Sequence, residues 1–229
     1  MRRDMRPSCY CLGLGEIEDC NLAKVLKLVE VVSGKPPKKV KLREYVLKSP
    51  DRRHTMWAEQ NLLGAPSEEE EKGEEEGEGR CVYKLCTSGR MRSAVQVDGN
   101  VGQMKRLTEE KLDCTTRSEF FERLETLKLK VNHDYVKEGY VFHLMEQGCQ
   151  TLLLDQTENK FEVVLRIVRL KLCEEVDGTV EEENAFPGKW LVELIAKASG
   201  ADFTKAIDAY KHFHRILDEH GIRCVSSVA

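Results

Sequence analysis

The first chemistry that the sequence offers is a pair of carboxylates near the N-terminus. Glu16 and Glu18 flank Ile17 at the end of 8–17, whose apolar residues among turn-formers indicate a strand. Alternate residues of a strand point to one face, so both carboxylates would lie together, as a divalent metal requires. Cys20 stands where a phosphate-binding lysine would follow them. The pattern is therefore only an incomplete version of a metal and phosphate site.

Charged residues on later segments extend this hypothesis. Triphosphate-tunnel enzymes carry a Glu-x-Glu-x-Lys strand and line a β-barrel with Arg, Lys and Glu of many strands. Here Arg166 and Lys171 lie in the strand-like segment 161–173, and Glu193 lies in a second such segment, 190–197. A metal-dependent triphosphate hydrolase is therefore the alternative function, and it would require a barrel lumen rich in Arg, Lys and Glu.

Other catalytic and cofactor motifs are incomplete in the sequence. Gly13 and Gly15 follow a strand, but Glu18 stands where a dinucleotide fingerprint needs its third glycine. No serine lies in a Gly-x-Ser-x-Gly elbow, and the nine cysteines lack the spacing of a zinc site. His212 and His214 lie about 200° apart on a helix and cannot share a metal. We therefore expect no catalytic residue, no metal and no cofactor.

Composition and charge narrow the class of protein further. The 229 residues are 41% apolar and 33% charged, and no apolar run reaches the ~20 residues of a membrane helix. Residues 68–79 hold eight Glu and one Lys, a charge of −7, so the rest of a chain with net charge −4 carries +3. This segregation predicts a mildly basic body that meets an acidic partner surface. It does not favour direct binding of nucleic acid or a membrane.

Helices with clear ends are predicted to alternate with strands. A helix over 22–33 ends at Gly34, Thr116-x-x-Glu119 opens a second helix that reaches 128, and a third covers 202–220. Strands are predicted at 8–17, 40–48, 81–86, 93–97, 129–136, 140–147, 149–156, 161–173, 190–197 and 222–225. This order predicts an α+β fold: a predominantly antiparallel, β-barrel-like sheet with about three flanking helices.

The chain is predicted to be a single domain, 1–229, with a disordered acidic insertion at 50–80. The Glu and Gly residues of 68–79 cannot bury enough apolar surface to offset the entropy of ordering them. Within the insertion, the apolar residues around 56–63 predict a short helix, and a second acidic stretch, 174–188, predicts a loop. The basic run 37–43 resembles a nuclear import signal. Alternatively, it is the polar edge of a strand, where lysines prevent pairing with another chain.

Four stretches resemble subunit 18 of Mediator, the transcription coactivator. They are 12–29, 42–49, 124–142 and 190–194 with the final helix; the best match is Val-Asn-His-Asp-Tyr-Val-Lys-Glu-Gly-Tyr-Val-Phe at 131–142. The sequence departs from the family at Lys128, where a glycine is usual, and in its longer acidic insertion.

The resemblance implies a non-catalytic scaffold subunit of the Mediator head module, which links transcription regulators to RNA polymerase II in the nucleus. Its fold would be a β-barrel akin to that of the triphosphate-tunnel enzymes. Its implied partners are subunit 20, as a heterodimer, the C-terminal helix of subunit 8, other head-module subunits and RNA polymerase II.

Four apolar residues are predicted to contact these partners. Val164 and Val168 belong to the apolar run of 161–173, and Phe203 and Tyr210 belong to the last helix. A strand that is apolar on both faces must be covered on both, and three helices cover only part of a barrel. The alternative is that these residues fill the core of this chain.

Overall fold

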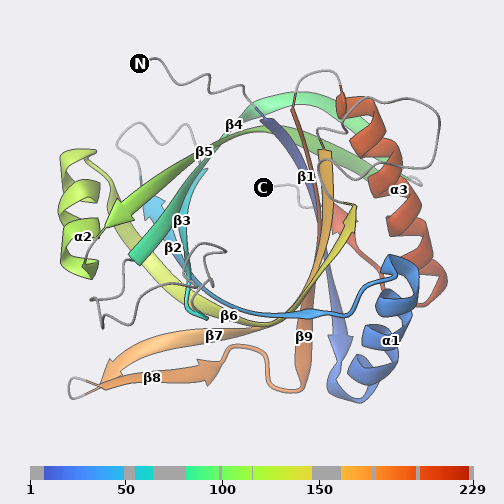
Figure 1. The fold of residues 1–229 in the computed structure, drawn as a ribbon, viewed down its shortest axis with the longest axis horizontal. Helices are drawn as coiled ribbons and strands as arrows, with labels where there is room; N and C mark the ends of the chain where they lie inside the picture. The colour runs from blue at the N-terminus through green and yellow to red at the C-terminus, as the bar shows by residue number, and fades with distance from the viewer. Residues whose placement is uncertain are drawn as a thin grey trace, which may run out of the picture.

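The strands of the computed structural model close into a barrel (Figure 1). The structure describes residues 8–48, 55–63, 81–97, 100–114, 116–145, 161–176, 179–199 and 202–226. Within them, ten strands form one sheet in the order β10-β1-β5-β4-β3-β2-β6-β7-β8, and β9 pairs with both β1 and β7. That double pairing closes a barrel of 8 antiparallel strands, from which β8 and β10 branch off.

The elements match the predicted α+β class in their order. The strands are β1 (Ser8–Glu18), β2 (Lys38–Lys48), β3 (Thr55–Asn61), β4 (Cys81–Val97), β5 (Asn100–Cys114), β6 (Lys130–Met145), β7 (Phe161–Val176), β8 (Thr179–Asn184), β9 (Lys189–Ser199) and β10 (Val225–Ser226). The helices are η1 (Asp19–Asn21), α1 (Leu22–Ser33), α2 (Arg117–Thr126) and α3 (Phe203–Glu219). The predicted barrel-like sheet with three flanking α-helices is confirmed for the described residues. None of the helices described is long and apolar enough to cross a bilayer.

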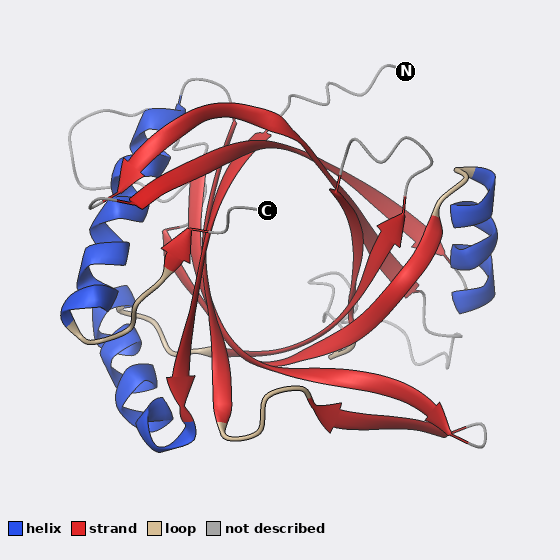
Figure 2. Ribbon diagram, turned by 180° about the vertical axis from the view of Figure 1, so that it is seen from behind, coloured by secondary structure: helices blue, strands red, loops and turns tan. Residues whose placement is uncertain are grey.

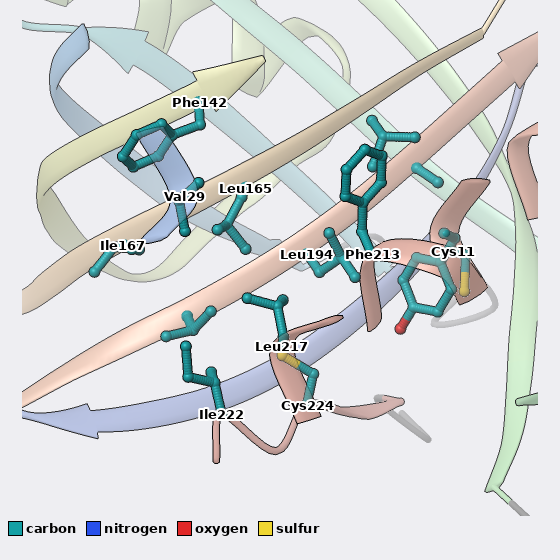
Figure 3. Packing of buried hydrophobic residues seen from close by; sticks show 14 of the residues in the cluster. Cys11, Val29, Phe142, Leu165, Ile167, Leu194, Phe213, Leu217, Ile222 and Cys224 are labelled. Atoms are coloured by element: carbon teal, nitrogen blue, oxygen red, sulfur yellow. The ribbon is translucent and has the colours of Figure 1, made fainter. Parts of the chain in front are cut away.

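The larger outer layer lies under α1 and α3, which stand together on one side of the barrel (Figure 2). Val29 of α1 and Phe213 of α3 pack into one buried cluster with Leu165 of β7 and Leu194 of β9 (Figure 3). Leu165 and Leu194 are at most 1% exposed, so each contributes about 1.5–3 kcal/mol of burial free energy. The chain's own helices therefore cover this face of β1, β7 and β9.

The smaller outer layer lies under α2, on the opposite side of the barrel (Figure 2). Phe120 stacks on Tyr83 of β4 with ring centroids 3.9 Å apart, and Tyr45 of β2 lies beside both rings. The Thr116 hydroxyl accepts a hydrogen bond from the Glu119 amide at 3.1 Å, which confirms the predicted helix start. Two helical layers therefore cover opposite parts of the wall.

Three strands occupy segments that the sequence analysis assigns otherwise. Residues 100–114 form β5, for which no strand is predicted. Residues 55–61, predicted as a short helix within the insertion, form β3 between β2 and β4, and 179–184 of the predicted acidic loop form β8. Their polar residues conceal the strand pattern, and pairing with neighbouring strands decides the conformation instead. The acidic tract 68–79 and the predicted strand 149–156 lie outside the described residues.

The predicted break between two strands at Gly139 is also wrong, because β6 runs through it without interruption. Gly139 pairs with Val168 of β7, and a Cβ at this position would collide with the carbonyl oxygen of Ile167. The glycine therefore permits close approach of two strands rather than a turn.

Candidate functional site: the charged barrel lumen

Charged side chains from several strands line the inside of the barrel. Residues of β1, β2, β3, β4, β5, β6, β7 and β9 surround a cavity of about 200 Å³. Its charged lining, which we call the lumen cluster, consists of Glu44, Glu59, Lys105, Glu109, Lys137, Arg166, Glu193 and Lys197. The cluster follows from strand alternation, since residues that alternate with the apolar outer layer must point inward.

Lys137 of β6 lies at the centre of the lumen cluster. Its ammonium is 2.9 Å from a carboxylate oxygen of Glu44 and 2.7 Å from one of Glu193, and all three side chains are buried. Tyr135 donates a further hydrogen bond to Glu44. Burial alone would lower the pKa of Lys137, but Glu193 and Glu44 outweigh it and raise the pKa above its ordinary value. Lys137 therefore stays charged and bridges β2, β6 and β9.

Arg166 of β7 provides the second link across the lumen. Its guanidinium lies 3.5 Å from Glu59 and 3.8 Å from Glu193. Burial alone would raise the pKa of Glu59, but Arg166, Lys137 and further lysines lower it to about 2. Glu59 is thus ionised throughout the physiological range.

Glu109 of β5 forms the third group of the lumen cluster. Lys84 and Lys197 approach its carboxylate to 2.6 and 2.9 Å. Burial works against ionisation of Glu109, but Lys197 and Lys84 outweigh it and lower its pKa. Each of the four lumen carboxylates therefore has a cation within 4 Å.

The charges of the lumen cluster balance one another. Four carboxylates face four cationic side chains, so the formal charge of the lining is zero. Outside the lining, Lys84 pairs with Glu109 and Glu162 pairs with Lys197, which adds one charge of each sign. A polyanion would have to displace carboxylates from their lysine and arginine partners, and a metal ion would have to displace the cations. The arrangement is thus a neutral network that joins strands across the barrel, rather than a site with an excess of one charge.

The Glu16 and Glu18 pair lies apart from this network. Both side chains are exposed, and Glu16 forms an ion pair with Lys189 at 2.8 Å. Cys20 is exposed in η1. By contrast, Arg166 and Glu193 do meet in the lumen, as the tunnel-enzyme hypothesis requires.

Lys171, the third charged residue of that hypothesis, points away from the lumen. It pairs with Glu138 and Glu182 on the outer face of the wall. Of the three charged residues that the hypothesis places in the lumen, Arg166 and Glu193 therefore lie there and Lys171 does not.

The four predicted partner-binding residues lie largely within the chain. Val168 and Tyr210 are fully buried, Val164 is 8% exposed, and Phe203 packs partly buried against the core. Val164 and Val168 alternate with the outward Leu165 and Ile167, so they face the lumen side and not the outside. In this structure a partner would reach only part of Phe203, and the role of all four in binding stays a prediction.

Of the eight residues in the lumen cluster, the sequence predicts Arg166 and Glu193 and misses the other six: Glu44, Glu59, Lys105, Glu109, Lys137 and Lys197. Most of these lie beside another charged residue, as Lys137 lies beside Glu138, so they gave only a weak signal. Glu59 and Glu109 lie on strands that were themselves not predicted. Glu193 lies between Val192 and Leu194, and of the six residues missed only Lys197, between Ala196 and Ala198, shares this pattern of a single charge among apolar residues.

Comparisons with known proteins find likeness in structure only. No protein family and no curated protein matches the sequence. A chain of the Schizosaccharomyces pombe Mediator head module superposes with a TM-score of 0.57 at 15% identity, over 92% of this chain and 95% of that one.

Two further solved structures are less similar. PH1819 of Pyrococcus horikoshii OT3 has a TM-score of 0.49 at 11% identity, over 93% and 91% of the two chains. The Mimivirus capping enzyme triphosphatase has a TM-score of 0.44 at 10% identity, over 92% and 90%. At these identities, the likeness to the Mediator head-module chain shows a common fold and leaves the function open.

Proposed function

We propose that this chain is a non-catalytic scaffold subunit of a Mediator head module, of the subunit 18 kind, and acts in the nucleus. The observation that carries the proposal is the pairing of charges in the lumen: each lumen carboxylate has a cation within 4 Å, and the lining has no net charge. The ion pairs of such a lumen join the strands of the barrel, and partners would bind to its outer surface.

Two further lines support the proposal. The sequence resembles subunit 18 in four stretches that occur in order, and the fold is that of a chain in the S. pombe Mediator head module. On this proposal the chain forms a heterodimer with subunit 20, binds the C-terminal helix of subunit 8, and joins other head-module subunits in linking regulators to RNA polymerase II.

The first test is purification of the tagged chain from cells of its source organism, followed by mass spectrometry. We expect co-purification of other Mediator subunits and RNA polymerase II. A Lys197→Gln variant is the matched control, because it removes a lumen charge without altering the outer surface and should retain the same partners. Recovery of the chain without any Mediator subunit would contradict the proposal, as would failure to form a 1:1 complex with subunit 20 in light scattering.

The second candidate function is metal-dependent hydrolysis of triphosphates. The residue types of the lumen favour it, because this function requires a lumen rich in Arg, Lys and Glu, whereas the pairing of these charges favours the scaffold. Arg166 and Glu193 are the residue types that a triphosphate tunnel would use, and Glu193 keeps one carboxylate oxygen without a hydrogen bond. Tripolyphosphate and nucleoside triphosphates should be incubated with the protein and Mg²⁺ or Mn²⁺. We expect no phosphate release above that of a buffer control.

Two paired variants make this test decisive. If phosphate is released and Glu193→Gln abolishes the release while Glu16→Gln/Glu18→Gln does not, the lumen is catalytic and the scaffold proposal fails. The reverse pattern would place the activity at the exposed carboxylates of β1 and also overturn the proposal. Equal thermal melting of the variants would show that the loss is chemical and not a loss of fold.

A further inference from the structure

The outer face of the wall formed by β2, β6 and β7 carries a groove, separate from the lumen. The groove has a volume of about 480 Å³. Four of its lining side chains are cationic, Lys39, Lys41, Arg169 and Lys171, and one is acidic, Glu138. Beside the lining, Asp19 pairs with Arg169 at 2.7 Å, and Glu182 pairs with Lys41 and Lys171. The four cations therefore face three carboxylates in all, which leaves a positive excess of one, although the chain as a whole has a charge of −4.

The strand register brings these cations together. Lys39 and Lys41 alternate on β2, and Arg169 and Lys171 alternate on β7, so each pair points to one face. Glu138 of β6 is the register partner of Lys41 on one side and of Arg169 on the other. Two short rows of cations thus flank a single strand.

The structure already shows how this surface binds a carboxylate. Glu182, on the acidic strand β8, lies 3.0 Å from Lys41 and 3.1 Å from Lys171. Hydrogen bonds from Lys41 and Lys171 lower the pKa of Glu182. Since partly exposed ion pairs contribute little free energy, another carboxylate could replace Glu182 at small cost.

Apolar and aromatic groups complete the groove. The Arg169 guanidinium lies over the Trp190 ring at 4.6 Å, and the Tyr140 and Trp190 rings are 6.0 Å apart. Leu63, also in the lining, is 51% exposed. A ligand with carboxylates and an occasional apolar side chain would complement both parts of this surface.

We propose that this groove binds an acidic, extended segment of a partner protein, whose carboxylates pair with Lys39, Lys41 and Lys171. Charge complementarity supports this, as does the position between Lys41 and Lys171 that Glu182 already occupies. Neither observation depends on the Mediator proposal. It gives the basic run 37–43 a role in β2: its odd-numbered lysines line a binding surface.

Fluorescence anisotropy tests the proposal with a labelled acidic peptide and the full chain. The probe copies residues 66–79, with eight glutamates, and the control peptide replaces each Glu by Gln. We expect binding of the Glu peptide alone, weakening as salt is raised. Lys39→Glu/Lys41→Glu should lower the affinity roughly tenfold or more, since it places like charges in the groove.

A matched variant separates the groove from general charge. Lys24→Glu/Lys27→Glu makes the same change in net charge on the exposed face of α1 and should alter the affinity by less than about twofold. Equal losses in both variants would overturn the proposal, because binding would then be non-specific. If Lys39→Glu/Lys41→Glu melts at a lower temperature than the unchanged chain, Lys39→Gln/Lys41→Gln replaces it.

A second variant of the chain tests which acidic segment occupies the groove. In this variant a short Gly-Ser linker replaces 66–79, so the chain's own acidic tract cannot compete. Comparable binding to both proteins supports a partner in trans. Binding only after the replacement would make the chain's own tract the occupant, and no binding to either protein would exclude an acidic ligand; both results overturn the proposal.

Discussion

The lumen and the outer layer under α1 and α3 are built from the same strands but with opposite chemistry. On β7, Leu165 and Ile167 point outward into an apolar cluster, whereas Arg166 between them points inward to Glu59 and Glu193. In the outer layer, non-directional burial of apolar area supplies stability. In the lumen, desolvated charges are tolerated only because each has a partner, so the network fixes which strands meet rather than adding much net stability.

The largest effect is expected when the lumen network loses its central cation. Lys137→Ala leaves Glu44 and Glu193 buried without their ammonium partner, which should cost about 3–5 kcal/mol of unfolding free energy at pH 7. Denaturant unfolding at pH 7 measures it, and Lys137→Met, which restores most of the side-chain volume but no charge, should cost nearly as much. A much smaller cost for Lys137→Met would show that lost packing dominates.

An outer-layer truncation should cost almost as much, but through lost packing alone. Leu194→Ala removes a fully buried side chain under α3 and should cost about 2–5 kcal/mol. The same unfolding experiment measures it, with the half-buried Leu26→Ala as a milder control. Leu194→Met conserves the volume and should cost much less than Leu194→Ala; an equal cost would mean that the contrast between the two regions does not hold.

The unfolding free energy should also depend on the ionisation of Glu59 in the lumen. Its pKa falls from 4.5 to about 2 on folding, so its ionised form stabilises the fold above pH ~4.5, and this contribution disappears as pH falls through about 2. Relative to the unchanged chain, Glu59→Gln should therefore lose about 2–3 kcal/mol at pH 7 and much less at pH 2.5. Exposed Glu110→Gln should show little change at either pH; a Glu59→Gln curve parallel to the unchanged chain would contradict the assignment.

The smallest expected effect lies outside both regions, at the end of α2. Lys128 adopts φ +57°, a left-handed conformation that side chains disfavour and glycine tolerates. Lys128→Gly should therefore stabilise the fold by about 0.5–1 kcal/mol, seen as a higher melting temperature. Lys130→Gly, two residues further on in β6, is the control and should destabilise; a loss of stability in both would rule out relief of strain.

Local patterns predict the helices and most of the strands correctly. The helix at 22–33 follows from its apolar spacing and its glycine exit, and Gly34 has the left-handed φ of +66° that such an exit requires. The strands with the strongest apolar pattern, β1, β2, β7 and β9, are predicted to within a few residues. Their signal is local, because a residue's face depends only on its own strand.

The sequence by itself determined that the chain forms an antiparallel sheet flanked by three helices, since periodicity and capping residues act within a few positions. Only the tertiary structure decided which charges meet. Glu44, Lys137 and Glu193 come from β2, β6 and β9, and they converge because β9 pairs with both β1 and β7 and closes the ring. Closure also decided that Val164 and Val168 face inward, because strand alternation fixes two faces but only the closed barrel defines which of them is the inside.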